Sequence, residues 1–102
     1  MNIIYNHSNE ALTVKLCGEI DHHGAKSARE EIDAAIKSSP PQKLIMDLSS
    51  ITFCDSSGLG LIMGRYKTIK EYGGELIIKN PSDSPRKMIL LSGLDRLITI
   101  TD

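Results

Sequence analysis

The stretch of residues 53–60, Phe-Cys-Asp-Ser-Ser-Gly-Leu-Gly, constrains the fold more than any other part of the chain. An apolar run at residues 44–46 precedes it, and a helical pattern over about residues 59–72 follows it. Asp55 and Ser56 fall between the two, and both residue types cap helices because their oxygens accept the free N–H groups of a first turn. The pattern predicts a strand, a tight turn and a helix, with either Asp55 or Ser56 as the cap. A hydroxyl and a carboxylate then lie together at the positive end of the helix dipole.

Three glycines, Gly58, Gly60 and Gly64, distinguish the predicted helix from an ordinary amphipathic one. Each costs a helix interior about 0.8–1 kcal/mol relative to Ala. Gly60 and Gly64 are four residues apart, so they share a helix face that carries no side chains. Two explanations are open: the helix packs closely on its own sheet, or the backbone of another protein approaches this face.

The apolar spacing of the same helix predicts which side is buried. The predicted buried stripe is Leu59, Ile62, Met63, Tyr66 and Ile69. Leu61 and Arg65 fall outside this stripe, toward the glycine side. The helix is expected to end at Gly73 and Gly74, which form a C-terminal stop.

The rest of the chain alternates between strand and helix patterns. Strands are predicted at about residues 3–7, 11–17, 43–48, 75–79 and 97–100, and two further helices follow the second and fourth strands. The unbroken apolar runs at 44–46 and 76–78 indicate strands that are buried on both faces. The order β-β-α-β-α-β-α-β predicts an α/β fold with an opening antiparallel hairpin and a mixed, mostly parallel sheet.

Ligand sites in sheets of this kind cluster beyond the carboxyl ends of the strands. Two loops share that end of the predicted sheet, Asp21-His22-His23 and the loop at residues 54–57. We therefore expect Asp21 to lie near Ser56.

Composition excludes several classes of protein. The net charge of −1 over 102 residues gives no electrostatic basis for binding nucleic acid. No apolar run approaches the roughly 18 residues of a membrane span, and no signal-peptide pattern opens the chain, so we expect a cytoplasmic protein. Cys17 and Cys54 each adjoin an apolar run, which favours reduced, buried thiols over a disulfide or a metal site.

Catalysis is the weaker interpretation of the 53–60 stretch. A hydrolase elbow reads Gly-x-Ser-x-Gly, and residues 54–58 lack the first glycine, although His22 or His23 could act as a base. Asp21-His22-His23 is also similar to a two-metal phosphoesterase signature, but the only other histidine is His7. The Gly-x-x-x-x-Gly-Lys-Ser phosphate loop is absent. A serine that is itself phosphorylated fits better, because a helix N-terminus stabilises the added dianion.

Three segments together resemble the STAS family, and within it the sporulation anti-sigma factor antagonists of endospore-forming bacteria. They are residues 18–23 (Gly-Glu-Ile-Asp-His-His), 55–67 (beginning Asp-Ser-Ser-Gly-Leu-Gly) and 92–94 (Ser-Gly-Leu). The resemblance covers nearly the whole chain and implies one STAS domain at 1–102, with helices packed on one face of the sheet. Family members usually continue into another helix after the last strand, so that helix is expected to be short or absent here.

The resemblance also implies a function without catalytic residues, metal or cofactor. A partner that is both anti-sigma factor and ATP-dependent serine kinase binds the unphosphorylated chain and releases the sigma factor. This kinase supplies the ATP and phosphorylates the first serine of the motif, and a serine phosphatase resets the switch. The free chain is expected to be a monomer.

Residue by residue, the resemblance makes Ser56 the phosphorylation site, flanked by Asp21, Asp55 and Ser57. The implied docking face, to the extent that its members face outward, comprises Gly58, Leu59, Gly60, Leu61, Gly64 and Arg65. The alternative is a STAS domain that binds a small ligand, a nucleotide or an anion, at the same loop. Incubation with a matching kinase and ATP, followed by a search for one added phosphate, separates the two.

Overall fold

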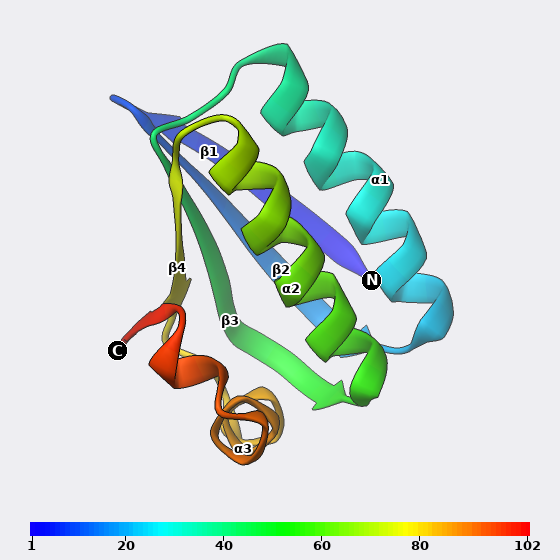
Figure 1. The fold of residues 1–102 in the computed structure, drawn as a ribbon. Coiled ribbons are helices and arrows are strands. Elements are labelled where there is room, and N and C mark those ends of the chain that lie inside the picture. Colours follow the sequence, from blue (N-terminus) through cyan, green and yellow to red (C-terminus); the bar gives the residue numbers. More distant parts are fainter.

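A computed structural model describes residues 1–102 and confirms the predicted α/β fold (Figure 1). The elements are β1 (Asn2–Ser8), β2 (Ala11–Ile20), α1 (His22–Ser38), β3 (Lys43–Cys54), α2 (Ser56–Glu71), β4 (Glu75–Lys79), α3 (Asp83–Ser92), a 3-10 turn (Leu94–Arg96) and β5 (Thr99–Thr101). The strands form one sheet in the order β1-β2-β3-β4-β5, in which only the β1–β2 pair is antiparallel. Helices α1 and α2 lie side by side on one face, and α3 lies near the end of β3 (Figure 1). No helix is long and apolar enough to cross a membrane.

Two strands are longer than predicted. β2 continues to Ile20 and β3 to Cys54, beyond the predicted ends at residues 17 and 48. The register between them shifts twice within residues 15–19, and Gly18 has a φ of +110°. These irregularities interrupt the two-residue period of the side chains, so the alternation in the sequence ends before the strands do.

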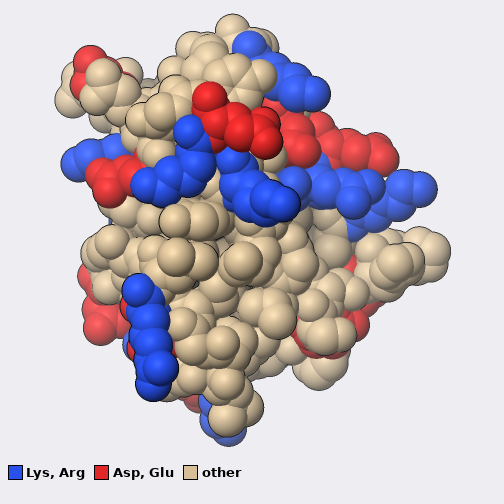
Figure 2. Space-filling model, viewed as in Figure 1, with Lys and Arg blue, Asp and Glu red and all other residues tan.

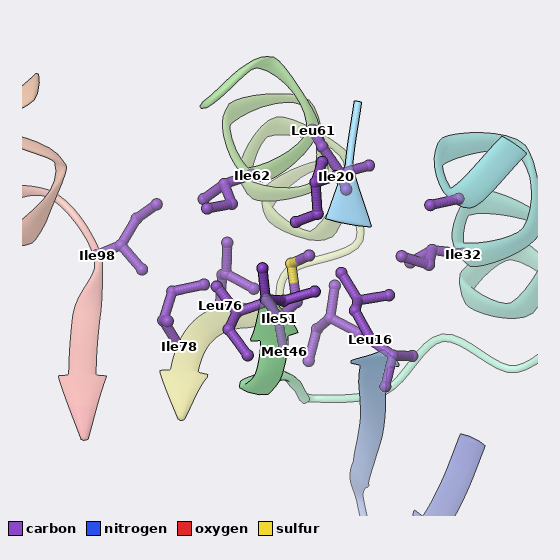
Figure 3. Close-up of a cluster of buried hydrophobic side chains, with 14 of the residues drawn as sticks. Leu16, Ile20, Ile32, Met46, Ile51, Leu61, Ile62, Leu76, Ile78 and Ile98 are labelled. Atoms are coloured by element: carbon purple, nitrogen blue, oxygen red, sulfur yellow. The ribbon is translucent and has the colours of Figure 1, made fainter. Parts of the chain in front are cut away.

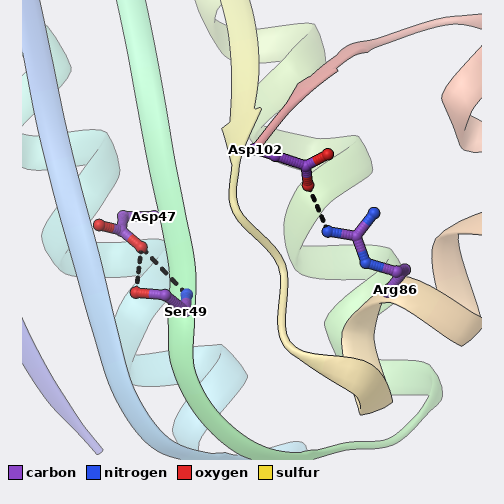
Figure 4. Close-up of polar contacts among 4 residues, drawn as sticks. All are labelled: Asp47, Ser49, Arg86 and Asp102. Atoms are coloured by element: carbon purple, nitrogen blue, oxygen red, sulfur yellow. Dashed lines mark hydrogen bonds and ion pairs between the residues drawn. The ribbon is translucent and has the colours of Figure 1, made fainter.

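The C-terminal segment also differs from the prediction. Leu94–Arg96 form a 3-10 turn, so the last strand is Thr99–Thr101 instead of residues 97–100. The Arg86 guanidinium of α3 lies 2.5 Å from the Asp102 carboxylate (Figure 4). Both side chains are solvent-accessible, so this ion pair contributes at most about 1 kcal/mol.

The core lies between the sheet and the helices (Figure 3). Its side chains come from both layers and include Leu16, Ile20, Ile32, Met46, Ile51, Leu61, Ile62, Leu76, Ile78 and Ile98. The other face of the sheet is only partly covered: Ile45 and Asp47 are half-buried, and Ser49 donates to Asp47 through its hydroxyl at 2.7 Å (Figure 4). The prediction that residues 44–46 and 76–78 are buried on both faces is therefore wrong, because the helices cover one face.

Helix α2 buries a different set of residues from the predicted stripe. The buried ones are Gly58, Leu61, Ile62, Arg65 and Ile69. Leu59, Met63 and Tyr66 are only half-buried. The difference arises because α1 covers the side of α2 that carries Leu61 and Arg65, whereas the opposite side meets only the shorter α3 and the turn after it.

Arg65 is the one charged side chain in the core. Its Nε lies 2.9 Å from Oδ1 of Asp33 on α1, but the N–H does not point at the oxygen, so the contact is an ion pair without an aligned hydrogen bond. Burial lowers the pKa of Arg65, and the charge of Asp33 opposes that shift. The guanidinium stays protonated in proteins, so Arg65 ties α2 to α1 by charge.

The three glycines of α2 have different surroundings. A Cβ on Gly58 would overlap Sγ of Cys54, so Gly58 allows the first turn of α2 to pack on the end of β3. A Cβ on Gly60 or Gly64 would meet nothing within 4 Å. Close internal packing therefore explains Gly58 but does not explain Gly60 or Gly64.

Substituting alanine at Gly58 and at Gly60 should change stability in opposite directions. We expect Gly58→Ala to lower the free energy of unfolding by about 1–2 kcal/mol. The overlap with Cys54 destabilises the fold by more than the higher helix propensity of alanine stabilises it. Gly60→Ala should raise it by roughly 0.5–1 kcal/mol, since the added methyl group meets only solvent. Urea unfolding followed by circular dichroism measures both.

The overlap with Cys54 supplies an internal control. Cys54→Ala removes the sulfur that the Gly58→Ala methyl group would overlap. Cys54→Ala should therefore lower the free energy of unfolding less in the Gly58→Ala variant than in the wild type. Equal effects of alanine at Gly58 and Gly60 would contradict the packing role of Gly58.

Candidate functional site

Asp55, in the turn between β3 and α2, is the N-cap residue of α2. The Asp55 backbone is extended, and its Oδ1 accepts a hydrogen bond from the Ser57 N–H at 2.7 Å. Its backbone carbonyl accepts the Gly58 N–H at 3.0 Å. Ser56 is therefore the first residue of α2. Its side chain is exposed, and its hydroxyl has no hydrogen-bond partner in the chain.

Asp21 occupies the equivalent position at the start of α1. Its Oδ1 accepts the Gly24 N–H at 2.7 Å, and this hydrogen bond lowers the pKa of the Asp21 carboxyl. Ile20 is paired in register with Cys54, and the Ile20 carbonyl accepts the Asp55 N–H at 3.2 Å. The two turns thus lie next to each other at the carboxyl ends of β2 and β3.

Two grooves flank the start of α2 and separate the predicted site residues. The α1–α2 groove, of about 280 Å³, is lined by Ser57 and by three basic side chains of α1, those of His22, Lys26 and Arg29. The α2–α3 groove, of about 740 Å³, is lined by Asp55 and Ser56 among others. Asp21 lines neither of them and faces a third hollow beside β1. Asp21 and Ser56 therefore share one edge of the sheet but no groove.

The predicted docking face divides into outward and buried residues. Gly60 is exposed, Gly64 faces open space, and Leu59 is half-buried along the α2–α3 groove. These three can meet a partner. Leu61 lines the α1–α2 groove together with Gly60, but the side chains of Leu61 and Arg65 are both buried. Neither can contribute its side chain to an outward face.

Helix α3 supplies the far wall of the α2–α3 groove, and it is absent from the predicted site. The Cys54 N–H donates to Ser84 Oγ at 2.9 Å, which fixes the start of α3 against the end of β3. Met88 and Leu91 then line the groove opposite Ser56. The spacing predicts that Met88 and Leu91 share the apolar face of a short helix, but it does not predict that this face lies opposite Ser56.

The site presents a free serine hydroxyl. Neither serine hydroxyl of the turn donates to His22 or His23, as an activated nucleophile would. Burial, and then the charge of Asp55, raise the pKa of the Cys54 thiol to about 11, so it is protonated at neutral pH. What remains is the free hydroxyl of Ser56 at a helix N-terminus, which favours added negative charge.

Comparison with known proteins agrees with this arrangement. The STAS domain model matches residues 2–102. The chain is 35% identical to the anti-sigma F factor antagonist of Paenibacillus polymyxa over 102 residues, which cover 100% of the chain and 87% of the relative. It is similar to the solved anti-sigma factor antagonist SpoIIAA in its unphosphorylated form, with a TM-score of 0.85, 29% identity and coverage of 99% and 89% of the two chains. The phosphorylated form of the Bacillus cell fate determinant SpoIIAA is similar as well, with a TM-score of 0.77, 30% identity and coverage of 99% and 92%. The chain therefore belongs to the STAS domain family and, within it, to the anti-sigma factor antagonists.

Proposed function

We propose that this antagonist is switched by phosphorylation of Ser56. The unphosphorylated chain binds an anti-sigma factor that is also a serine kinase, and the sigma factor is released. The kinase transfers the γ-phosphoryl group of ATP to Ser56: the Oγ–phosphorus bond forms, the bond to ADP breaks, and the hydroxyl proton is released. A serine phosphatase hydrolyses the phosphate and restores binding. The chain acts as a cytoplasmic monomer and needs no cofactor of its own, because the kinase holds the ATP.

The free hydroxyl of Ser56 is the observation that carries this proposal. Ser56 is exposed at the first position of α2, where the helix dipole stabilises negative charge by roughly 0.3–1 kcal/mol. The Asp55 carboxylate already caps the helix, so it does not compete for the Ser56 hydroxyl. Ser57 is half-buried and faces α1, which makes it the poorer acceptor. The similarity to a phosphorylated antagonist supports the assignment.

The surface beside Ser56 suits the approach of a partner. Gly60 and Gly64 leave the backbone of α2 uncovered on its outer side. Figure 2 shows a band of acidic and basic side chains across the upper half of this face and few charged side chains in the middle of the face below that band. A partner that docks over Gly60 also meets Lys26 and Arg29, which line the α1–α2 groove together with that glycine.

The two serines of the motif should respond differently to the kinase. We expect Ser56→Ala to abolish phosphorylation, because it removes the free hydroxyl, and Ser57→Ala to retain most of it. The assay uses a matching anti-sigma kinase with ATP, and mass spectrometry to map the site. Phosphate incorporation into Ser56→Ala at the wild-type rate would show that the assignment is wrong.

A large side chain at Gly64 should block docking without unfolding the domain. We expect Gly64→Leu to weaken kinase binding by more than about 1 kcal/mol, since it fills the bare surface that the partner contacts. Its free energy of unfolding should stay the same or rise, because leucine is the better helix former. Isothermal titration calorimetry and urea unfolding measure the two quantities.

Ala34→Leu, at an exposed position of α1, is the matched control and should leave binding unchanged. If Gly64→Leu unfolds the domain, the glycine serves internal packing. If it folds and binds normally, the partner docks elsewhere.

The α1–α2 groove supports a second candidate function, the binding of a small anion or nucleotide. His22, Lys26 and Arg29 line it together with Ser57, and no carboxylate does. Titration of ATP and of inorganic phosphate into the labelled protein tests this candidate. Saturable shifts of the Ser57 and Gly60 amide resonances would support it, and unchanged spectra at millimolar ligand would exclude it.

A further inference from the structure

The α2–α3 groove, which receives the side chain of Ser56, contains one cationic side chain. The charged residues that line it are Asp55, Asp83 and Lys87. Any phosphate on Ser56 therefore enters a groove that holds two carboxylates and a single ammonium group. The carboxylates repel a dianion, so Lys87 alone can attract it within this groove.

Lys87 is held near Ser56 by the way α3 is attached to β3. The Cys54 N–H donates to Ser84 Oγ at 2.9 Å, and Cys54 Sγ lies 3.6 Å from Met88 Sδ. Lys87 lies between these two anchor residues of α3, one turn after the first of them. The first turns of α3 cannot move away from the Ser56 turn without breaking both contacts.

The two carboxylates of the groove leave Lys87 available. Asp55 is occupied as the cap of α2, where its Oδ1 accepts the Ser57 N–H. Asp83 lies in the first turn of α3, where the helix dipole already favours its negative charge. The Lys87 side chain is exposed and forms no ion pair or hydrogen bond in the chain.

We propose that Lys87 is the intramolecular counter-ion of a phosphate on Ser56. The pair lies across a groove that is also lined by the apolar side chains of Leu59, Met88 and Leu91. Phosphorylation thus covers part of this apolar surface with a fixed ion pair and requires no movement of a helix. The inference rests on the proposed function only in placing a phosphate on Ser56.

The second pKa of the phosphoserine reports its neighbours. A nearby cation favours the dianion and lowers this pKa, so removal of the cation raises it. The test uses chains that carry phosphoserine at position 56, inserted during translation, so that no kinase is needed. Phosphorus NMR titration between about pH 4 and 8 measures the pKa in the wild type, Lys87→Gln, Lys87→Arg and the control Lys67→Gln. Lys67 is exposed on α2, about 16 Å further along the helix, and lines neither groove.

We expect Lys87→Gln to raise the phosphoserine pKa by roughly 0.3 units or more at low salt, the size expected of an exposed ion pair. Lys87→Arg should titrate like the wild type because it keeps the charge, and Lys67→Gln should differ by less than about 0.1 units. The difference for Lys87→Gln should shrink in 1 M NaCl, as screening requires. A pKa in Lys87→Gln equal to that of the wild type at low salt would overturn the proposal, as would an equal rise in Lys67→Gln. Failure of the kinase to modify Ser56 would instead count against the proposed function and would leave this titration unaffected.

Discussion

The fixed end of β3 is the constraint on which the rest of the site depends. The Cys54 N–H is bound by the Ser84 hydroxyl of α3, and the Asp55 N–H is bound by the Ile20 carbonyl of β2. The Asp55 carboxylate then closes the first turn of α2. Since neighbours on both sides and the helix itself fix this backbone, Ser56 is presented at one position. A modification there changes the charge of a surface whose backbone is already determined.

Helix α2 is anchored on its inner sides and bare on its outer side. Gly58 brings its first turn onto the end of β3, and the Arg65–Asp33 ion pair fastens it to α1. With these contacts in place, Gly60 and Gly64 can leave the outer backbone uncovered, although glycine costs each position about 0.8–1 kcal/mol of helix propensity. No packing contact inside the domain explains that cost, because a Cβ at either glycine would meet no atom within 4 Å. We propose that the docking of the partner on this bare surface explains why glycine occupies both positions.

The element order and the strand–turn–helix around Ser56 could be predicted from the sequence. Helix caps, glycine stops and the spacing of apolar residues all depend on residues that are close together in the chain. The choice between Asp55 and Ser56 as the cap needed the hydrogen bond to Ser57. The burial of Arg65 could not be predicted from the sequence for a different reason. A charged residue is expected to face solvent unless an oppositely charged partner is known, and the partner, Asp33, lies on another helix. The part of α3 in forming the groove beside Ser56 could not be predicted either, because Ser84 reaches the end of β3 only in the folded chain.

The central claim is that phosphorylation changes docking without refolding the domain. It is tested most directly by measuring, with and without phosphate on Ser56, both the free energy of unfolding and the affinity for the kinase. The helix N-terminus stabilises the phosphate and Asp55 repels it, so stability should change by less than about 2 kcal/mol. Affinity should fall much further, because docking would strip water from a dianion that has a single ammonium group to balance it, and this desolvation costs several kcal/mol. A large loss of folding stability with unchanged affinity would contradict this account and would indicate an order–disorder switch.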